Sequence, residues 1–507
     1  MKLNGWKMVC AACAFCVASV SSNSAQTFTT LMSFDQANGE SPQSSLVQGP
    51  NGRFYGTTTG GGSTTLCPWT QGCGTVFEIS AAGQVTTIYN FCSQSGCADG
   101  QDPSAVIVGP GGNLYGTTTD GGVTSFGTVF KITPSGNLIT LHNFCTQNAG
   151  CSDGMNPETG LVVGANGNLY GTTISGGTNG AGTIFEITPA GVLTTIYNFC
   201  SLRNCSDGDF PSGLVLGGDG NFYGTAAGNN GSRTFGDVFR VTPAGKLTVL
   251  HRFCSESNCA DGATPAGGLA QGPNGELYGT TYYGGANESS CYRGCGTVFE
   301  ITRSGQLTTL YSFCSQSNCS DGEWPGAAPV LDAKGNLYGT TAYGGASLQC
   351  GAYGCGTAFK ITRSGQFTSL YSFCSQTECS DGELPVASLV LATNGNLYGT
   401  TAFGGTDGDC TNTIDTGCGT VFVLSKAAKP FVQTLPGFGI VGAEVGILGN
   451  KLTGATSVTF NGLSATFTVK SATMIFANVP IDATNGYVTV TTANGTLKSN
   501  VPFEVMQ

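Results

Sequence analysis

The sequence predicts an all-β protein: a seven-bladed β-propeller closed by its N-terminal strand, followed by an immunoglobulin-like β-sandwich. Three observations lead to this prediction. A unit of 53 to 60 residues recurs seven times, each unit contains four short segments of strand character, and the composition changes after the last unit. The 507 residues include 80 glycines and only 10% charged residues, which favours short strands joined by tight turns over disorder.

Residues 1–25 are typical of a secretory signal peptide, with a basic start, an apolar stretch at 8–20 and small polar residues before a cleavage site between Ser22 and Gln26. The apolar stretch is too short to span a membrane. A lipoprotein signal would need a suitable motif before Cys13 or Cys16, and "VCAAC" is a poor one. We therefore expect a secreted or extracytoplasmic protein, in the periplasm or at the cell surface, whose mature chain has no transmembrane segment.

The repeated unit is marked by the tripeptide "YGT" and is illustrated by its second copy. That copy reads "AVIVG" (105–109), "NLYGTTT" (113–119), "GTVFKIT" (127–133) and "NLITLHNF" (137–144). Alternating side chains and β-branched residues, bounded by Gly, Pro and Asn, indicate four strands. The tyrosines of the seven copies are Tyr55, Tyr115, Tyr170, Tyr223, Tyr278, Tyr338 and Tyr398. We expect each of these tyrosines, and the Phe of each "GTVF", in the core between blades.

The strand count predicts a closed ring over residues 27–425. A fourth-strand segment, "FTTLMSF" (28–34), precedes the first complete unit, whereas the last unit ends at "GTVFVLS" (419–425) without a fourth strand. Pairing residues 28–34 with the last unit completes seven blades and leaves no free sheet edge.

The motifs "GNLYGTT", "GTVFKITPSG" and "LTTLYSF" resemble the Gloeo_Verruco (GloVer) tandem repeats of secreted bacterial proteins, over about four-fifths of the chain. This resemblance implies an extracellular repeat protein and assigns no chemistry. After a linker at 426–430, residues 431–507 contain no cysteine and alternate in "SVTFNG", "ATFTV" and "GYVTVTT", as expected for a small β-sandwich. This segment resembles an IPT/TIG domain, which implies a spacer or adhesion module.

The twenty cysteines that follow the signal peptide form ten pairs that are local in sequence. Their spacing is irregular and the chain has only two histidines, so a metal site with regular ligand spacing is not indicated. No Cys-x-x-Cys redox motif occurs in the mature chain. We predict local disulfides, each worth about 2 kcal/mol. The pairs are Cys92/Cys97, Cys145/Cys151, Cys200/Cys205, Cys254/Cys259, Cys314/Cys319 and Cys374/Cys379 in "FCSQSNC"-type segments, and Cys67/Cys73, Cys291/Cys295, Cys350/Cys355 and Cys410/Cys418 before "GTVF" or "GTAF".

An Asp-Gly pair follows each "FCSQSNC"-type segment. The positions are Asp99, Asp153, Asp207, Asp261, Asp321 and Asp381, with Asn38 in the seventh copy. The two interpretations are a turn in which the carboxylate accepts backbone N–H bonds and a ring of Ca²⁺ ligands. Because calcium needs six to eight oxygens at one point, one carboxylate per blade favours the turn, and we expect neither a metal nor a cofactor.

Both cysteine families are expected on one face of the propeller, because the loops between strands two and three and between consecutive blades open on the same side. The former loop is long and carries aromatic residues in the neighbouring blades five, six, seven and one. These candidate ligand-binding residues are Trp69, Tyr282, Tyr283, Tyr292, Tyr343, Tyr353 and Phe403. Aromatic side chains on stiff loops can stack against sugar rings; alternatively, they pack over the blades and keep the loops ordered.

A catalytic site is not indicated. His142 and His251 occupy the repeat position of Tyr89, Tyr197, Tyr311 and Tyr371, so we expect them to be structural. A glycosidase needs two carboxylates that face one sugar, and the innermost strands offer only Glu158 and Asp332, at opposite ends of their strands. A hydrolase or lyase on the loops of this face would use carboxylates such as Asp120, Glu288 or Asp409, and nothing in the sequence shows that these three converge.

A binding or adhesion scaffold for an extracellular polysaccharide or a cell-surface protein is the function that the sequence favours. The alternatives are a polysaccharide-degrading hydrolase or lyase on the same face, and a structural envelope component. A net charge of −11 without a basic cluster argues against nucleic acid as a partner. The sequence alone does not identify the ligand or the oligomeric state.

Overall fold

The computed structural model describes residues 26–63, 67, 72–146, 150–228, 235–272, 274–287, 291, 293–347, 349–406, 410, 417–425 and 427–506. The predicted signal peptide lies outside these residues. Strands and short 3-10 turns are the regular elements of the described part of the chain. The repeats build antiparallel sheets, six of four strands as predicted and one of five. Among the same residues, no helix has the length and apolar character needed to cross a membrane.

We number the repeat sheets by their "YGT" strands. Sheet 1 comprises β2 (Val47–Gln48), β3 (Phe54–Thr58), β4 (Thr75–Ile79) and β5 (Val85–Asn90). Sheet 2 comprises β6 (Gln101–Pro103), β7 (Ile107–Val108), β8 (Leu114–Asp120), β9 (Thr128–Ile132) and β10 (Leu138–Asn143). Sheet 3 comprises β11 (Val162–Val163), β12 (Leu169–Thr173), β13 (Thr183–Ile187) and β14 (Leu193–Asn198). Sheet 4 comprises β15 (Pro211–Leu216), β16 (Phe222–Ala226), β17 (Asp237–Val241) and β18 (Leu247–Arg252).

Sheets 5 to 7 repeat this order. Sheet 5 comprises β19 (Ala263–Gln271), β20 (Leu277–Tyr283), β21 (Thr297–Ile301) and β22 (Leu307–Ser312). Sheet 6 comprises β23 (Val330–Leu331), β24 (Leu337–Thr341), β25 (Thr357–Ile361) and β26 (Phe367–Ser372). Sheet 7 comprises β27 (Val390–Leu391), β28 (Leu397–Thr401), β29 (Thr420–Leu424) and the N-terminal strand β1 (Phe28–Ser33), in which Phe28 faces Leu424.

Short 3-10 turns lie in the connections between these strands. They are η1 (Ser95–Cys97), η2 (Pro110–Gly112), η3 (Arg203–Cys205), η4 (Ser257–Cys259), η5 (Ser317–Cys319), η6 (Gly351–Tyr353) and η7 (Thr377–Cys379).

An edge-to-face contact between two phenylalanines joins each repeat sheet to the next. The Phe that ends a fourth strand packs against the "GTVF" Phe of the following sheet, with ring centroids 5.0 to 5.3 Å apart. The pairs are Phe34–Phe77, Phe91–Phe130, Phe144–Phe185, Phe199–Phe239, Phe253–Phe299, Phe313–Phe359 and Phe373–Phe422. The "GTVF" rings are fully buried, so these contacts form the core between sheets, as expected.

The glycine of each "YGT" makes room for these rings. A Cβ at Gly279 would lie 2.4 Å from Cζ of Phe299, and the equivalent glycines of the other sheets are equally close to their own Phe, at 2.5 to 2.7 Å. Such approaches are far inside van der Waals contact. The strand glycines are therefore required by packing rather than by backbone conformation.

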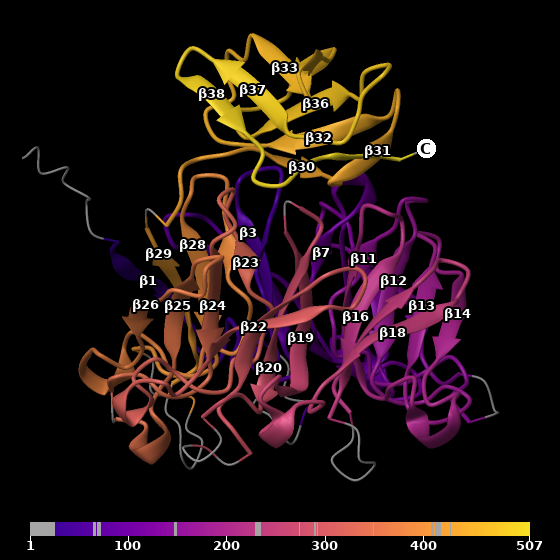
Figure 1. Ribbon diagram of the computed structural model, residues 1–507. Helices are drawn as coiled ribbons and strands as arrows, with labels where there is room; N and C mark the ends of the chain where they lie inside the picture. Colours follow the sequence, from indigo (N-terminus) through magenta and orange to yellow (C-terminus); the bar gives the residue numbers. More distant parts are fainter. Residues whose placement is uncertain are drawn as a thin grey trace, which may run out of the picture.

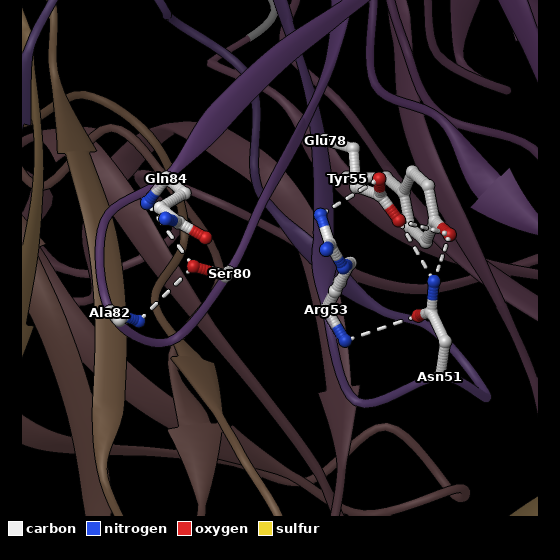
Figure 2. A network of polar contacts seen from close by, with 7 residues as sticks. All are labelled: Asn51, Arg53, Tyr55, Glu78, Ser80, Ala82 and Gln84. Carbon is white, nitrogen blue, oxygen red and sulfur yellow. Dashed lines mark hydrogen bonds and ion pairs between the residues drawn. The ribbon is translucent and has the colours of Figure 1, made fainter.

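The "YGT" tyrosines are also buried, apart from the half-buried Tyr55. Figure 2 shows how the hydroxyl of Tyr55 is satisfied: it donates to Oε1 of Glu78 at 3.0 Å and accepts from Nδ2 of Asn51 at 2.8 Å. Arg53 forms an ion pair with Glu78 at 3.2 Å. Burial raises the pKa of Tyr55 to about 12, so this hydroxyl stays a donor.

Residues 433–506 form three further sheets, which lie above the repeat sheets in Figure 1. One comprises β30 (Gln433–Leu435), β32 (Glu444–Leu448), β36 (Met474–Asn478) and β35 (Phe467–Val469). Another comprises β34 (Leu463–Ser464), β33 (Ser457–Phe460), β37 (Val488–Thr492) and β38 (Gly495–Lys498), and β31 (Phe438–Ile440) pairs in parallel with β39 (Glu504–Met506). These elements enclose their own hydrophobic core around Val445, Ile475 and Val490.

The C-terminal sheets rest on one end of the repeat sheets, which we call the turn face because the tight turns lie there. Oγ1 of Thr473 donates to the carbonyl of Pro50 at 2.7 Å, and Gln271 donates to Glu504 at 3.1 Å. The opposite end, at the bottom of Figure 1, carries the cysteine loops. We call it the cysteine-loop face, and the C-terminal sheets leave it uncovered.

Replacing Gly279 with Ala should destabilise the protein by about 1–3 kcal/mol, because the new methyl group would displace Phe299 from the contact between sheets. Urea unfolding followed by tryptophan fluorescence measures the change. Gly437→Ala is the matched control, since its Cβ would meet nothing within 4 Å. Equal stability of the two variants would contradict the role of the strand glycines.

Candidate binding face

Ten disulfides stiffen the cysteine-loop face. Six close the connection from a fourth strand to the next sheet, and four lie in the loops between second and third strands. They join the residues that the sequence pairs locally. Each spans four to eight positions, so each constrains a short loop and contributes little to the cohesion of the sheets. Disulfides on this scale are consistent with an extracytoplasmic compartment.

Cys151 differs from the second cysteine of the other five "FCSQSNC"-type segments, although it pairs with Cys145 as predicted. The other five each end a 3-10 turn and lie five positions after their partner, whereas Cys151 lies six positions after Cys145 and no 3-10 turn is described before it. The extra residue lengthens the loop, of which residues 147–149 lie outside the described part. The carbonyl of Cys151 still accepts from Gly154 N and Gly177 N at 2.9 and 2.8 Å, so the turn that follows is unchanged.

The two disulfide families meet where a sheet has both. In sheets 1, 5 and 6, the four sulfurs of two disulfides lie within 4.8 Å of one another. In sheet 5 these are the Cys291–Cys295 and Cys314–Cys319 bonds. The loop between strands two and three is thereby packed directly against the loop that leads to the next sheet.

The Asp-Gly carboxylates hold turns. In the fifth repeat, Asp321 accepts from the backbone N–H groups of Ser315 and Gln316 at 2.9 and 3.2 Å, and the hydroxyl of Tyr311 donates to it at 2.7 Å. The same pattern recurs at Asp99, Asp207 and Asp381. Because these oxygens already accept several bonds, the geometry favours the turn over the calcium interpretation.

Both histidines replace tyrosine in this arrangement. Nε2 of His142 lies 2.9 Å from Oδ2 of Asp153, and Nε2 of His251 lies 3.0 Å from Oδ2 of Asp261. Each imidazole also packs edge-on against the Phe two positions later. Their role is the structural one expected from the repeat.

Four of the predicted aromatic residues converge on a residue that was not predicted, Trp324. The indole stacks with Tyr282 at a centroid distance of 5.6 Å and with Tyr353 at 6.2 Å. It meets Tyr343 and Tyr283 edge-on at 5.2 and 6.1 Å. We call these five residues the aromatic cluster; they come from sheet 5, from the loop before β25, and from the connection between sheets 5 and 6.

The aromatic cluster is anchored by a hydrogen bond to a neighbouring loop and is exposed to solvent on one side. The indole N–H of Trp324 donates to the carbonyl of Gly294 at 3.2 Å, inside the loop closed by Cys291–Cys295. Tyr353 is 61% exposed and lies in the loop closed by Cys350–Cys355. One disulfide-closed loop therefore anchors the half-buried indole of Trp324, and another presents the exposed phenol ring of Tyr353 to solvent.

The other predicted aromatic residues do not join this cluster. Among the described residues, no ring contact links Phe403 to it. Trp69 and Tyr292 lie outside the described residues, as do the loop carboxylates Glu288 and Asp409. Among the described residues, the seventh and first repeats thus add no ring to the aromatic cluster, although the predicted surface extended over four repeats.

Glu323 lies under the aromatic cluster. Its side chain is almost fully buried and Oε2 lies 2.8 Å from Sγ of Cys291. Burial raises the pKa of Glu323 to about 7. The charge of Glu323 also contributes, after burial and the neighbouring tyrosines, to raising the pKa of Tyr282 to about 12.

Carboxylates gather on the other side of the cysteine-loop face. Burial, together with the charges of Asp120 and Glu158, raises the pKa of Asp102 to about 6. Burial also raises the pKa values of Asp120 and Glu158. We call these three residues the carboxylate cluster; Asn156 donates to Asp120 at 3.2 Å and lies beside it.

The carboxylate cluster differs from the pair of carboxylates, Glu158 and Asp332, that the sequence places on the innermost strands. Asp332 lies at the turn face, where it accepts from Lys334 N and Asn336 N at 2.9 Å and from the hydroxyl of Tyr338 at 3.1 Å. It therefore holds a turn, while Glu158 interacts with residues of sheet 2. The grouping depends on Asp102 of β6, which no sequence motif singles out.

Replacing Glu323 with Gln should stabilise the protein in a pH-dependent way. The carboxyl group has a raised pKa when folded, so the unfolded chain loses its proton first, and folding is penalised increasingly from about pH 4.5 to pH 7. We expect the Gln variant to gain on the order of 1–3 kcal/mol over wild type across this window. Urea unfolding at pH 4, 5.5 and 7.5 measures it, and a difference that is constant with pH would contradict the assignment.

Comparison with solved structures places the chain among similar folds. A fungal alcohol oxidase of the AA5 family, solved in complex with copper, is 11% identical with a TM-score of 0.50, and the match covers 95% of this chain and 99% of that one. PorZ, a bacterial surface component of the type-IX secretion system of Porphyromonas gingivalis, is 13% identical with a TM-score of 0.46, covering 94% of this chain and 60% of that one. The first likeness shows the fold alone.

A copper centre does not fit the donors of this chain. Copper prefers imidazole and thiolate ligands, but His142 and His251 are bound to separate aspartates and the clustered cysteines are paired in disulfides. We derive no chemistry through copper.

Comparison with curated proteins found no match. The model of the Gloeobacter/Verrucomicrobia repeat matches residues 146–314 and 257–476, which together span more than half of the chain. The matched segments carry the strand glycines, the "GTVF" phenylalanines and the Asp-Gly turns described above. The chain therefore belongs to the Gloeobacter/Verrucomicrobia repeat family.

Proposed function

We propose that the protein is an exported binding scaffold whose aromatic cluster holds an extracellular glycan. Its residues 27–425 form a seven-bladed propeller closed by the N-terminal strand, and residues 431–507 form an immunoglobulin-like domain of the IPT/TIG type. Residues 1–25 direct export and are removed.

Closure of the ring is supported by contacts between the first and last repeats. Strand β1 pairs with β29 and carries Phe34, whose ring packs on Phe77 of sheet 1. Thr393 N donates to Oε1 of Gln48 at 3.0 Å, and Ser41 N donates to the carbonyl of Cys418 at 3.0 Å. These are the contacts that sheet 7 would make with sheet 1 in a closed propeller, where no edge strand stays open.

The position of the C-terminal sheets supports a spacer or adhesion role. They contact the turn face through Thr473 and Glu504 and leave the cysteine-loop face free. A partner bound by the cysteine-loop face would therefore not compete with whatever the C-terminal domain contacts. The cysteine content supports export, since disulfides persist outside the cytoplasm.

The aromatic cluster is the single observation that carries the proposal. Sugar rings present apolar faces of C–H groups that pack on aromatic rings, while their hydroxyls need nearby polar groups. Trp324 and Tyr353 offer stacked rings with an interplanar angle of 30°, fixed by two disulfide-pinned loops. Because the rings are ordered before binding, little conformational entropy is lost when a ligand stacks on them.

Replacing Tyr353 or Trp324 with Ala should weaken glycan binding about tenfold, as expected when one contact worth about 1.4 kcal/mol is lost. Native gels cast with single polysaccharides, including hydroxyethyl cellulose, xylan, chitosan and alginate, measure retardation of the mature protein. Phe235→Ala is the matched control, an aromatic residue of the same face that is 47% exposed and outside the cluster.

Retardation that survives both cluster substitutions would contradict the proposal. Tyr353 is the sharper position, because its exposed ring can be removed without opening a core. If no polymer of a broad panel retards the wild-type protein, the structural envelope role replaces the binding role.

The carboxylate cluster favours a second candidate, a polysaccharide-degrading enzyme. A glycosidase uses one protonated and one ionised carboxyl group, and Asp102 has a pKa of about 6 beside two further carboxylates. The hydroxyls of a glycan held on the same face could reach these groups.

For this second candidate, the expected result is a cleared zone around the wild-type band in one gel after staining for the polymer. Asp102→Asn should abolish clearing and keep retardation, because the amide retains the shape of the side chain and cannot transfer a proton. Clearing that persists in Asp102→Asn would remove Asp102 from the catalytic role.

A further inference from the structure

In every repeat, the residue three positions after the Asp or Asn of the Asp-Gly turn adopts the left-handed backbone conformation. The φ angles of these residues lie between 52° and 55°. We call them the left-handed positions: Ser41, Asp102, Asn156, Phe210, Thr264, Trp324 and Leu384. None is glycine, although glycine is the residue that this conformation disfavours least.

The backbone frame around these positions is constant. Each is preceded two residues earlier by glycine and followed directly by proline. Each donates its N–H to a carbonyl at the end of the loop between strands two and three of the preceding sheet, at 2.6 to 3.1 Å. The following proline covers the glycine before that sheet's third strand, so closely that a Cβ on the glycine would lie 2.2 to 2.8 Å from the proline Cδ.

The side chains in this constant frame are all different. Seven repeats carry seven residue types, including the β-branched Thr264 and the bulky Phe210 and Trp324, which are the least suited to positive φ. The neighbouring glycines and prolines do not vary at all. The backbone bonds of the frame use none of these side chains, although Asn156 and Trp324 also donate to the carbonyls of Thr119 and Gly294 at 3.2 Å. A side chain retained against its backbone preference, in a frame whose own bonds do not use it, indicates a role beyond that frame.

We infer that the left-handed positions, apart from the buried Ser41, are the ligand-reading residues of the cysteine-loop face, an inference that rests on the proposed glycan-binding function. Each position is bonded to a carbonyl that precedes the third strand of the neighbouring sheet. The positions therefore lie on one face of the repeats, one in each repeat. Trp324, the centre of the aromatic cluster, is one of them.

The positions divide into two halves that define the ligand class. Asp102 and Asn156 make the half on repeats 2 and 3 polar, and Phe210, Trp324 and Leu384 make most of the other half apolar. The polar half also includes Asp120 and Glu158, whose charges already act on Asp102. An anionic polymer would be repelled there, so the ligand is a glycan without acidic groups, stacked on the apolar half and hydrogen-bonded on the polar half.

The first test needs no ligand. Thr264→Gly and Asp102→Gly should unfold at the same urea concentration as wild type or at a higher one, because glycine relieves the left-handed backbone. Thr86→Gly, at an exposed position of strand β5, is the control and should unfold earlier. If the two left-handed variants are as destabilised as the control, their side chains serve the fold and the inference is overturned.

The second test uses matched polymer pairs in native gels: hydroxyethyl against carboxymethyl cellulose, and methyl-esterified against de-esterified pectin. In each pair that binds the protein, the neutral polymer should retard it more than the acidic one. Each of Leu384→Gly, Phe210→Gly and Asn156→Gly should weaken retardation by the neutral polymer at least threefold. Asp102→Asn should reduce the difference in retardation between the neutral and the acidic polymer of each pair.

The outcomes distinguish a failure of this inference from a failure of the proposed glycan-binding function. Binding that is lost in Tyr353→Ala and unchanged in the glycine variants keeps the glycan function and overturns the role of the left-handed positions. Stronger retardation by the acidic members overturns the ligand class. Absence of retardation by every polymer overturns both proposals.

Discussion

The edge-to-face contact between phenylalanines of neighbouring sheets is the interaction on which the remaining structure depends. It recurs with nearly the same geometry between every pair of successive sheets. It exists only because a glycine in the adjoining strand leaves the ring its space. The same buried contact therefore serves every junction between successive sheets. Loops and turns can therefore differ from repeat to repeat without disturbing the core. The loop before Cys151, which is one residue longer than its counterparts, is an example.

This separation of a constant core from variable loops explains why the two faces differ. The turn face uses short turns whose polar groups are satisfied locally, as around Tyr55 and Glu78 (Figure 2), and it supports the C-terminal sheets. The cysteine-loop face carries longer connections, and disulfides limit their motion where a buried core cannot. A stiff loop that still reaches solvent is what a binding surface requires, and Tyr353 in its disulfide-closed loop is the clearest instance.

Most of the fold could be predicted because the repeat makes each pattern visible seven times. The strands, the cysteine pairs, the role of the strand glycine and the structural histidines all follow from aligning the chain with itself. The surface was harder, since contacts between loops depend on how loops fold back. Trp324 belongs to the connection between sheets, and no periodicity connects it to Tyr282 or Tyr353. Asp102 likewise gains Asp120 as a neighbour through the pairing of β6 with β8, and Glu158 from the connection that leads to sheet 3.

The left-handed positions show a different limit of sequence reasoning. A glycine in the sequence is the usual sign of a positive φ angle, and glycine is absent from all seven positions. The signal that was present is variation: within "Gly-x-X-Pro" the outer residues never change and X changes every time. In a repeat protein, a variable residue in an invariant frame needs an explanation other than folding, because identical frames have identical structural needs. The physical cost of Thr264 or Trp324 at positive φ strengthens that argument, since drift alone would not keep disfavoured residues where glycine fits better.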